Sequence, residues 1–192
     1  MSKPDTPHSS ARVEPGMEDT SGFLRLSYPS IACRPVPRFN LIIPSHWVVT
    51  EFPNALFVMG SSNGEDGSPV EEYWSNVVVH HERVLPEVTF ETLAQSTLED
   101  LQADIPNAII EEEIIAELGE HTHFIREITV PGETPAASVT RIDTFMFGPV
   151  QDHPTLDLFR ITWLHPKPAG DERKALYRDI LSSLEFEAEP EE

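Results

Sequence analysis

The chain of 192 residues carries 33 Asp and Glu against 13 Lys and Arg, which gives a formal net charge of −20. A field of this sign repels nucleic-acid phosphates and anionic lipid surfaces, so we expect neither nucleic acid nor a membrane surface as a partner. A single cysteine, Cys33, excludes an intramolecular disulfide framework and a thiolate zinc cluster. We therefore expect a cytoplasmic protein that is stabilised by packing.

The sequence divides into a tail, a domain and a second tail. Residues 1–37 predict a disordered tail and then an extended arm, because their first part holds few large apolar side chains and Pro29, Pro35 and Pro37 interrupt the rest. We find no apolar run long enough for a signal-peptide core or a membrane span. One domain is expected at residues 38–187, followed by an acidic tail at residues 188–192.

The first part of the domain predicts strands. Phe39, Leu41 and Ile43 alternate with other residues, and Pro44 then removes a backbone donor and ends the strand. Residues 55–59 and 76–84 predict two more strands, the second because three consecutive valines favour extended backbone. Residues 60–69 between them are dense in turn formers and predict an exposed loop.

A helix, a meander and a second helix should follow. Thr89 is placed to cap a helix with apolar residues at three-and-four spacing from Phe90 to Leu101. The run 108–119 fits helix or strand, and its β-branched isoleucines favour strand. Residues 123–130, 138–147 and 155–164 predict antiparallel strands, the last with Trp163 on a face that should meet a helix. That helix should begin near Gly170 and Asp171, before a short strand at residues 184–186.

These features carry a resemblance to a known superfamily. Phe39, Pro44 and Trp47 form a Phe-x-x-x-x-Pro-x-x-Trp opening, Thr89 and Leu93 lie in the capped helix, and the chain closes on Ser183, Leu184 and Phe186. Over roughly residues 38–187 the sequence resembles the PsbP-like fold superfamily, and within it the actinobacterial LpqN and LpqT lipoprotein family.

The resemblance implies an α+β fold, an antiparallel β-sheet flanked by helices in a PsbP-like α/β/α sandwich. It also implies a protein that assists, binds or regulates other proteins, and it transfers no catalytic residues because its motifs are packing features. Members of the lipoprotein family carry a signal sequence and an anchor cysteine, and we expect both to be absent from this chain.

Tyr73 and Trp74 are the candidate binding residues. Glu71 and Glu72 precede them directly after the predicted loop, which places an aromatic pair at a rim, and tryptophan is enriched in binding hot spots. Trp47 and Trp163, in contrast, are expected in the core. We expect the segment with Tyr73 and Trp74 to contact a partner protein.

Two further sets of side chains suggest chemistry. His121 and His123 would point the same way on a strand, where Glu111 or Glu113 nearby would complete a zinc site, but the sequence holds no closed ligand set. Consecutive glutamates 111–113 would point to opposite faces of a strand, and we expect them to meet solvent rather than to form a carboxylate pair for acid/base work. We therefore expect no metal, no cofactor and no catalytic residues.

Two functions from different classes follow. The first is a non-enzymatic protein-binding or chaperone-like accessory protein of the LpqN type, whose acidic surface complements another protein. The alternative is an enzyme that binds a small molecule or metal in a pocket between sheet and helix, with His121 and His123 as first candidates. The sequence also leaves open a homo-oligomer formed through an edge of the sheet.

Overall fold

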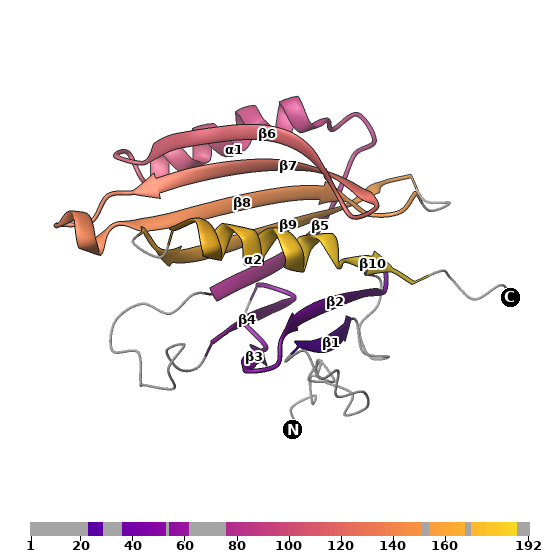
Figure 1. The fold of residues 1–192 in the computed structure, drawn as a ribbon. Coiled ribbons are helices and arrows are strands. Elements are labelled where there is room, and N and C mark those ends of the chain that lie inside the picture. Colours follow the sequence, from indigo (N-terminus) through magenta and orange to yellow (C-terminus); the bar gives the residue numbers. More distant parts are fainter. Residues whose placement is uncertain are drawn as a thin grey trace, which may run out of the picture.

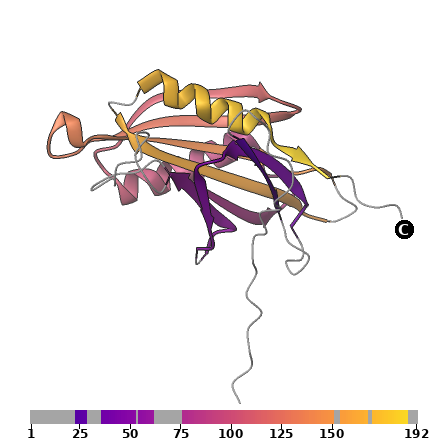
Figure 2. The same cartoon turned by 60° about the horizontal axis from the view of Figure 1, so that its bottom comes forward.

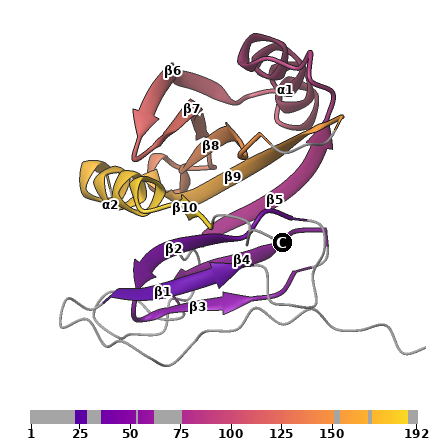
Figure 3. The same cartoon turned by 90° about the vertical axis from the view of Figure 1, so that its right-hand side faces the viewer.

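The computed structural model describes residues 23–28, 36–52, 54–61, 76–150, 154–167 and 170–187. Its strands form a seven-stranded antiparallel sheet in the order β3-β4-β5-β9-β8-β7-β6 and a three-stranded sheet in the order β1-β2-β10. Helices α1 and α2 lie on opposite faces of the larger sheet (Figures 1 and 3). The fold is therefore α+β, an antiparallel sheet flanked by helices, as the sequence predicts.

The elements follow one another along the chain with short connections in the second half. They are β1 (Phe23–Tyr28), β2 (Phe39–Pro44), β3 (Trp47–Thr50), β4 (Phe57–Ser61), β5 (Asn76–Val84), α1 (Phe90–Asp104), β6 (Ile109–Leu118), β7 (His121–Val130), a 3-10 turn (Pro135–Ala137), β8 (Val139–Phe147), β9 (Leu156–Pro166), α2 (Gly170–Ser182) and β10 (Glu185–Phe186). Among the described residues, no helix is long and apolar enough to cross a membrane.

The main core lies on the face of the sheet that α2 covers. Alternation along β9 places Phe159, Ile161 and Trp163 on this face, and all three are buried. The Tyr177 ring of α2 packs with its centroid 4.6 Å from that of Trp163, and its hydroxyl donates to the Ile161 carbonyl at 3.2 Å. The expectation that the Trp163 face meets a helix is confirmed.

The three-stranded sheet lies on this same face, next to α2 (Figure 2). β10 follows α2 directly and pairs with β2, so the end of the chain is joined to the start of the domain. Phe39 of β2 meets Phe159 edge-on, with 5.5 Å between ring centroids. The hydrophobic residues of β2 therefore complete the core that α2 begins.

Helix α1 closes the other face with a smaller apolar cluster. Thr89 caps it through a capping box with Thr92, which confirms the predicted start. Leu93 of the helix packs with Phe124, Phe145 and Leu158 of the sheet.

The predicted meander is confirmed, because β6, β7, β8 and β9 pair antiparallel in chain order. The ambiguous run before Gly119 is strand β6, as its isoleucines favoured. Two strands extend the prediction: Trp47–Thr50 is a strand of its own, and Phe23–Tyr28, in the predicted extended arm, pairs with β2. The division into tail, domain and tail remains a prediction.

Candidate functional site

Strand β6 forms one edge of the seven-stranded sheet, and most of its residues are exposed. It pairs with β7 on one side from Ile109 to Leu118, with a β-bulge between Ile110 and Glu112. On its other side no strand pairs with it among the described residues. Gly119 ends it with φ of 61°, a left-handed conformation that suits glycine in the tight turn to β7. Within the described part of the chain, the outer backbone groups of this ten-residue strand have no strand partner.

Large apolar side chains are exposed along this edge. Ile109 is 52% exposed, Ile110 37% and Ile115 57%. These are three of the eight large hydrophobic residues that are exposed in the described part of the chain, and they lie on one strand. Exposed apolar side chains along an open sheet edge are typical of a place where another chain docks.

The three consecutive glutamates of β6 face different surroundings, because the bulge interrupts the simple alternation. Glu111 accepts hydrogen bonds from Thr129 Oγ1 at 2.6 Å and from Lys167 Nζ at 3.3 Å, and these donors, Thr129 first, lower the pKa of its carboxyl group. Glu113 pairs with Arg126 on the α1 face at 2.6 Å. All three glutamates are exposed, as expected, but Glu111 and Glu113 also bond to side chains of the neighbouring strands.

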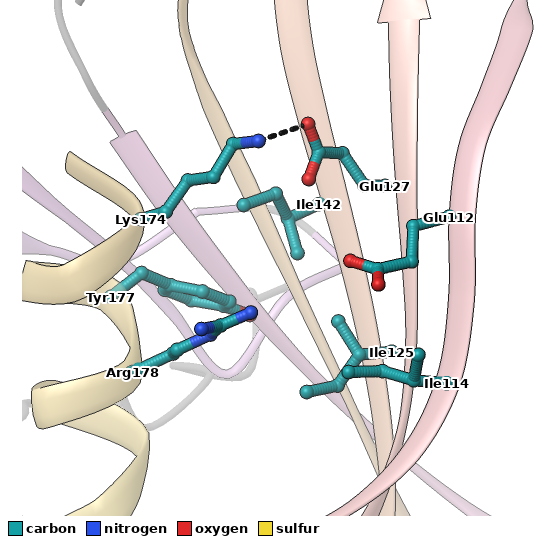
Figure 4. A pocket seen from close by; sticks show the side chains of 8 residues that line it. All are labelled: Glu112, Ile114, Ile125, Glu127, Ile142, Lys174, Tyr177 and Arg178. Carbon is teal, nitrogen blue, oxygen red and sulfur yellow. Dashed lines mark ion pairs between the residues drawn. The ribbon is translucent and has the colours of Figure 1, made fainter. Parts of the chain in front are cut away.

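Glu112 lines a hollow between β6, β7, β8 and α2 (Figure 4). Lys174 and Arg178 reach into it from the helix, and Lys174 forms an ion pair of 2.5 Å with Glu127. The cavity volume is about 20 Å³, room for on the order of one or two water molecules. Pockets for small ligands hold roughly 300–1,000 Å³, so this hollow between sheet and helix is too small to be one.

His121 and His123 share one face of β7, as predicted, with 6.5 Å between ring centroids. His123 is fully buried, and burial lowers its pKa from 6.5 to about 4, so this imidazole is neutral near pH 7. Phe186 packs on His121 with 5.1 Å between ring centroids, and the Nε2 atom of each imidazole is buried without a hydrogen-bond partner among the described residues.

The two histidines do not meet the glutamates that were expected to complete a metal site. His121 lies opposite Leu118 at the far end of β6, whereas Glu113 lies opposite Arg126 and bonds to it. Glu111 is engaged with Thr129 and Lys167. Among the described residues, no group of three or more His, Cys, Asp and Glu side chains is placed to hold a metal.

A histidine–aspartate pair lies where the end of β5 meets the start of β9, and the sequence alone did not predict it. His81 Nε2 lies 2.8 Å from Asp157 Oδ1, and Arg83 Nε lies 3.6 Å from the same oxygen. The Asp157 side chain is only 5% exposed. His81 also packs on Phe159, with 5.1 Å between ring centroids. Strand pairing aligns Arg83 with Asp157, a long-range match that spacing along the sequence does not reveal.

Of the other residues singled out in the sequence, two tryptophans lie in the core and the rest lie outside the described residues. Trp47 and Trp163 are buried and their ring centroids lie 6.4 Å apart, which confirms them as core. Tyr73, Trp74 and Cys33 lie outside the described residues, as does most of the predicted loop 60–69. The hypothesis that Tyr73 and Trp74 contact a partner therefore stays a prediction.

Solved structures share this arrangement of sheets and helices. LpqN of Mycobacterium tuberculosis, described as involved in cell envelope biogenesis, superposes with a TM-score of 0.60 at 9% identity, over 88% of this chain and 94% of that one. PsbP of the cyanobacterium Synechocystis superposes with a TM-score of 0.58 at 12% identity, over 91% and 98%. The chain has a PsbP-like fold. At these identities the likeness establishes the fold alone.

A third solved structure, a protein of unknown function from Pseudomonas aeruginosa described as a putative regulator, superposes with a TM-score of 0.51 at 10% identity, over 87% of this chain and 99% of that one. No family model matches the sequence. No curated protein matches it either.

Proposed function

We propose that this chain is a non-enzymatic accessory protein of the LpqN type that binds another protein. The observation that carries this proposal is the open β6 edge, where Ile109, Ile110 and Ile115 are exposed beside unpaired backbone. A sheet edge of this kind binds an extended chain through main-chain hydrogen bonds, which need no pocket. The net charge of −20 further favours a partner of opposite charge.

We also propose that the protein acts in the cytoplasm and that Tyr73 and Trp74 belong to a partner-binding surface. Both rest on the sequence: one cysteine without a disulfide framework for the first, and an aromatic pair after a turn-rich segment for the second. Fractionation of host cells, followed by detection of the untagged protein, tests the first. Recovery in the membrane or envelope fraction would contradict it.

Affinity capture from the native host tests the binding function. The tagged full chain is gently crosslinked in cells, and the captured proteins are identified by mass spectrometry against a tagged acidic protein of equal net charge. We expect a reproducible partner whose recovery falls as salt is raised, because charge-steered interfaces weaken with ionic strength. Failure to retain a partner at low and at moderate salt would overturn the proposal.

The same capture tests the aromatic pair. A Tyr73→Ala/Trp74→Ala variant should recover less of the partner than the parent chain, since aromatic hot spots often account for 2 kcal/mol or more of binding, about thirtyfold in affinity. A partner retained at unchanged affinity would remove these two residues from the interface while leaving the binding function intact.

A further inference from the structure

We propose that the open side of β6 binds a basic extended segment of the partner, which adds to the seven-stranded sheet as a further strand. The inference rests on the proposed binding function and specifies its partner. The strand supplies a backbone template of ten residues, Ile109–Leu118, whose inner side is already held by β7. A preformed edge loses little conformational entropy when a second strand pairs with it.

The negative charge of the β6 edge favours a basic partner segment. Glu112 and Glu117 are exposed on β6, and Glu111 and Glu113 next to them keep exposed carboxylates, with 41% and 39% of their side chains accessible. Lys167 and Arg126 already pair with these last two, and Lys174 and Arg178 of α2 reach into the hollow that Glu112 lines. A partner strand with lysine or arginine at alternate positions would place positive charge beside this acidic row, since opposite charges on neighbouring strands stabilise the pair.

The two faces of β6 predict which residues of the partner segment lie between its lysines and arginines. Ile114 and Ala116 are half-buried on the face that α2 covers, where Ile114 borders the hollow with Ile125. A strand added beside them would turn alternate side chains toward this hollow. Apolar residues fit beside Ile114 and Ala116, with Glu112 farther along the same face, whereas Glu113 and Glu117 lie on the opposite face. The expected segment therefore alternates basic and apolar residues.

A second copy of this chain is a poor occupant. Two copies could pair their β6 strands antiparallel about a two-fold axis. If this axis passes beside Glu112 or Glu113, that glutamate lies directly opposite the same residue of the second copy. An axis at Ile115 sets Glu113 opposite Glu117, and an axis at Ile114 brings Glu117 beside the bulge of the other strand. Like charges directly opposite one another destabilise a strand pair, and the net charge of −20 adds longer-range repulsion.

Glutamates on an edge strand can also serve only to prevent aggregation. The exposed isoleucines distinguish such a protective edge from one that binds a partner strand. Protective edges are short, carry charge or hold a β-bulge, and β6 has both glutamates and a bulge between Ile110 and Glu112. β6 is ten residues long, and Ile109 and Ile115 are more than half exposed on it. The edge thus repels copies of itself while keeping the apolar surface that a basic strand would cover.

The test uses a capped ten-residue peptide of alternating lysine and valine, added to the full-length protein. Hydrogen exchange should slow at those β6 amides that point away from β7, and titration should give binding that weakens as salt rises. An alternating glutamate–valine peptide, and a peptide with all lysines before all valines, should bind at least about tenfold more weakly, since 1.4 kcal/mol corresponds to tenfold. Equal binding of the block peptide would overturn the proposal, because it keeps the charge without the alternation.

A matched pair of variants locates the contact. Ile115→Lys/Glu112→Lys changes the β6 edge by three charges, and Val48→Lys/Glu51→Lys makes the same change at the β3 edge, where Val48 is 50% exposed. The first should weaken peptide binding at least about tenfold, and the second should change it less than about twofold. Equal weakening by both would show attraction to net charge alone and overturn the inference.

Capture and sedimentation distinguish failure of the β6 assignment from failure of the proposed partner-binding function. A native partner retained equally by the Ile115→Lys/Glu112→Lys variant would leave the binding function standing and overturn the β6 assignment. A parent chain that sediments as a dimer, and becomes a monomer in this variant, would identify the occupant as a second copy and overturn the basic-strand proposal. Melting temperatures equal to that of the parent chain would show that both double variants are folded.

Discussion

On the α2 face of the seven-stranded sheet, Trp163 and Tyr177 are buried among aromatic and aliphatic side chains, whereas on the α1 face a charged side chain, Arg126, is buried beneath the helix. Its guanidinium donates to Glu113 at 2.6 Å, to the Ala94 carbonyl at 2.6 Å and to Thr97 Oγ1 at 3.0 Å. The α2 face is thus held mainly by apolar area, which is non-directional. The α1 face also depends on hydrogen bonds, which fix where the helix sits.

The hydrogen bonds of the α1 face also hold the β6 edge in place. Arg126 ties Glu113 of β6 to the carbonyl and hydroxyl groups of α1, so the outer strand is fastened to the helix as well as to β7. A strand held on two sides is a preorganised template for a third chain. The polar network of one face therefore supports the surface that we propose as the docking site.

The largest effect should come from the apolar face. Trp163→Ala removes a fully buried side chain that contacts Trp47 and Tyr177, and it should lower the free energy of unfolding by about 3–5 kcal/mol. Urea denaturation followed by circular dichroism measures this loss. Leu93→Ala under α1 is the matched test of the other face and should cost about 2 kcal/mol. A larger loss from Leu93→Ala would reverse our ranking of the two faces.

Acid should weaken the α2 face through His123. Its folded-state pKa of about 4 lies below the ordinary 6.5, so the unfolded chain binds a proton between these values while the folded chain does not. Stability from the neutral imidazole is complete above pH 6.5 and falls by about 3 kcal/mol on going down to pH 4. His123→Leu should remove this part of the pH dependence. Parallel curves of unfolding free energy against pH for parent and variant would contradict the assignment.

On the polar face, Arg126→Met should lower the free energy of unfolding by about 2 kcal/mol. The Ala94 carbonyl and Thr97 hydroxyl lose a charged donor, while Glu113, with 39% of its side chain exposed, regains water. Arg126→Lys should recover only part of the loss, because an ammonium group cannot reach three acceptors in a planar fork. Full recovery by lysine in denaturant titrations would show that charge alone matters there.

The smallest expected loss of unfolding free energy comes from the cap at the start of α1, on the polar face of the sheet. Thr89→Ala removes the side chain that accepts from the Thr92 amide, which should cost about 1 kcal/mol. Thr89→Ser keeps the acceptor and should cost less than half as much. Chemical denaturation of the two variants side by side measures the difference, and equal losses would mean that the cap contributes nothing specific.

Local patterns in the sequence determined most of the elements. The three valines of β5, the cap at Thr89 and the alternation of Phe159, Ile161 and Trp163 act over a few residues, and each predicted the observed element or buried face. The meander was predictable for the same reason, since turn residues separate consecutive strands. The fold followed from these patterns and from the resemblance that they support.

Only the tertiary structure decided which distant side chains meet. Pairing of β5 with β9 brings Arg83 to Asp157, and the bulge in β6 sends Glu111 and Glu113 to different donors. The burial of Arg126 depends on where α1 crosses the sheet, and the open edge depends on which strand comes last in the sheet order. Sequence spacing sets period and local conformation, whereas contacts between segments far apart in the chain depend on the packing of the whole domain.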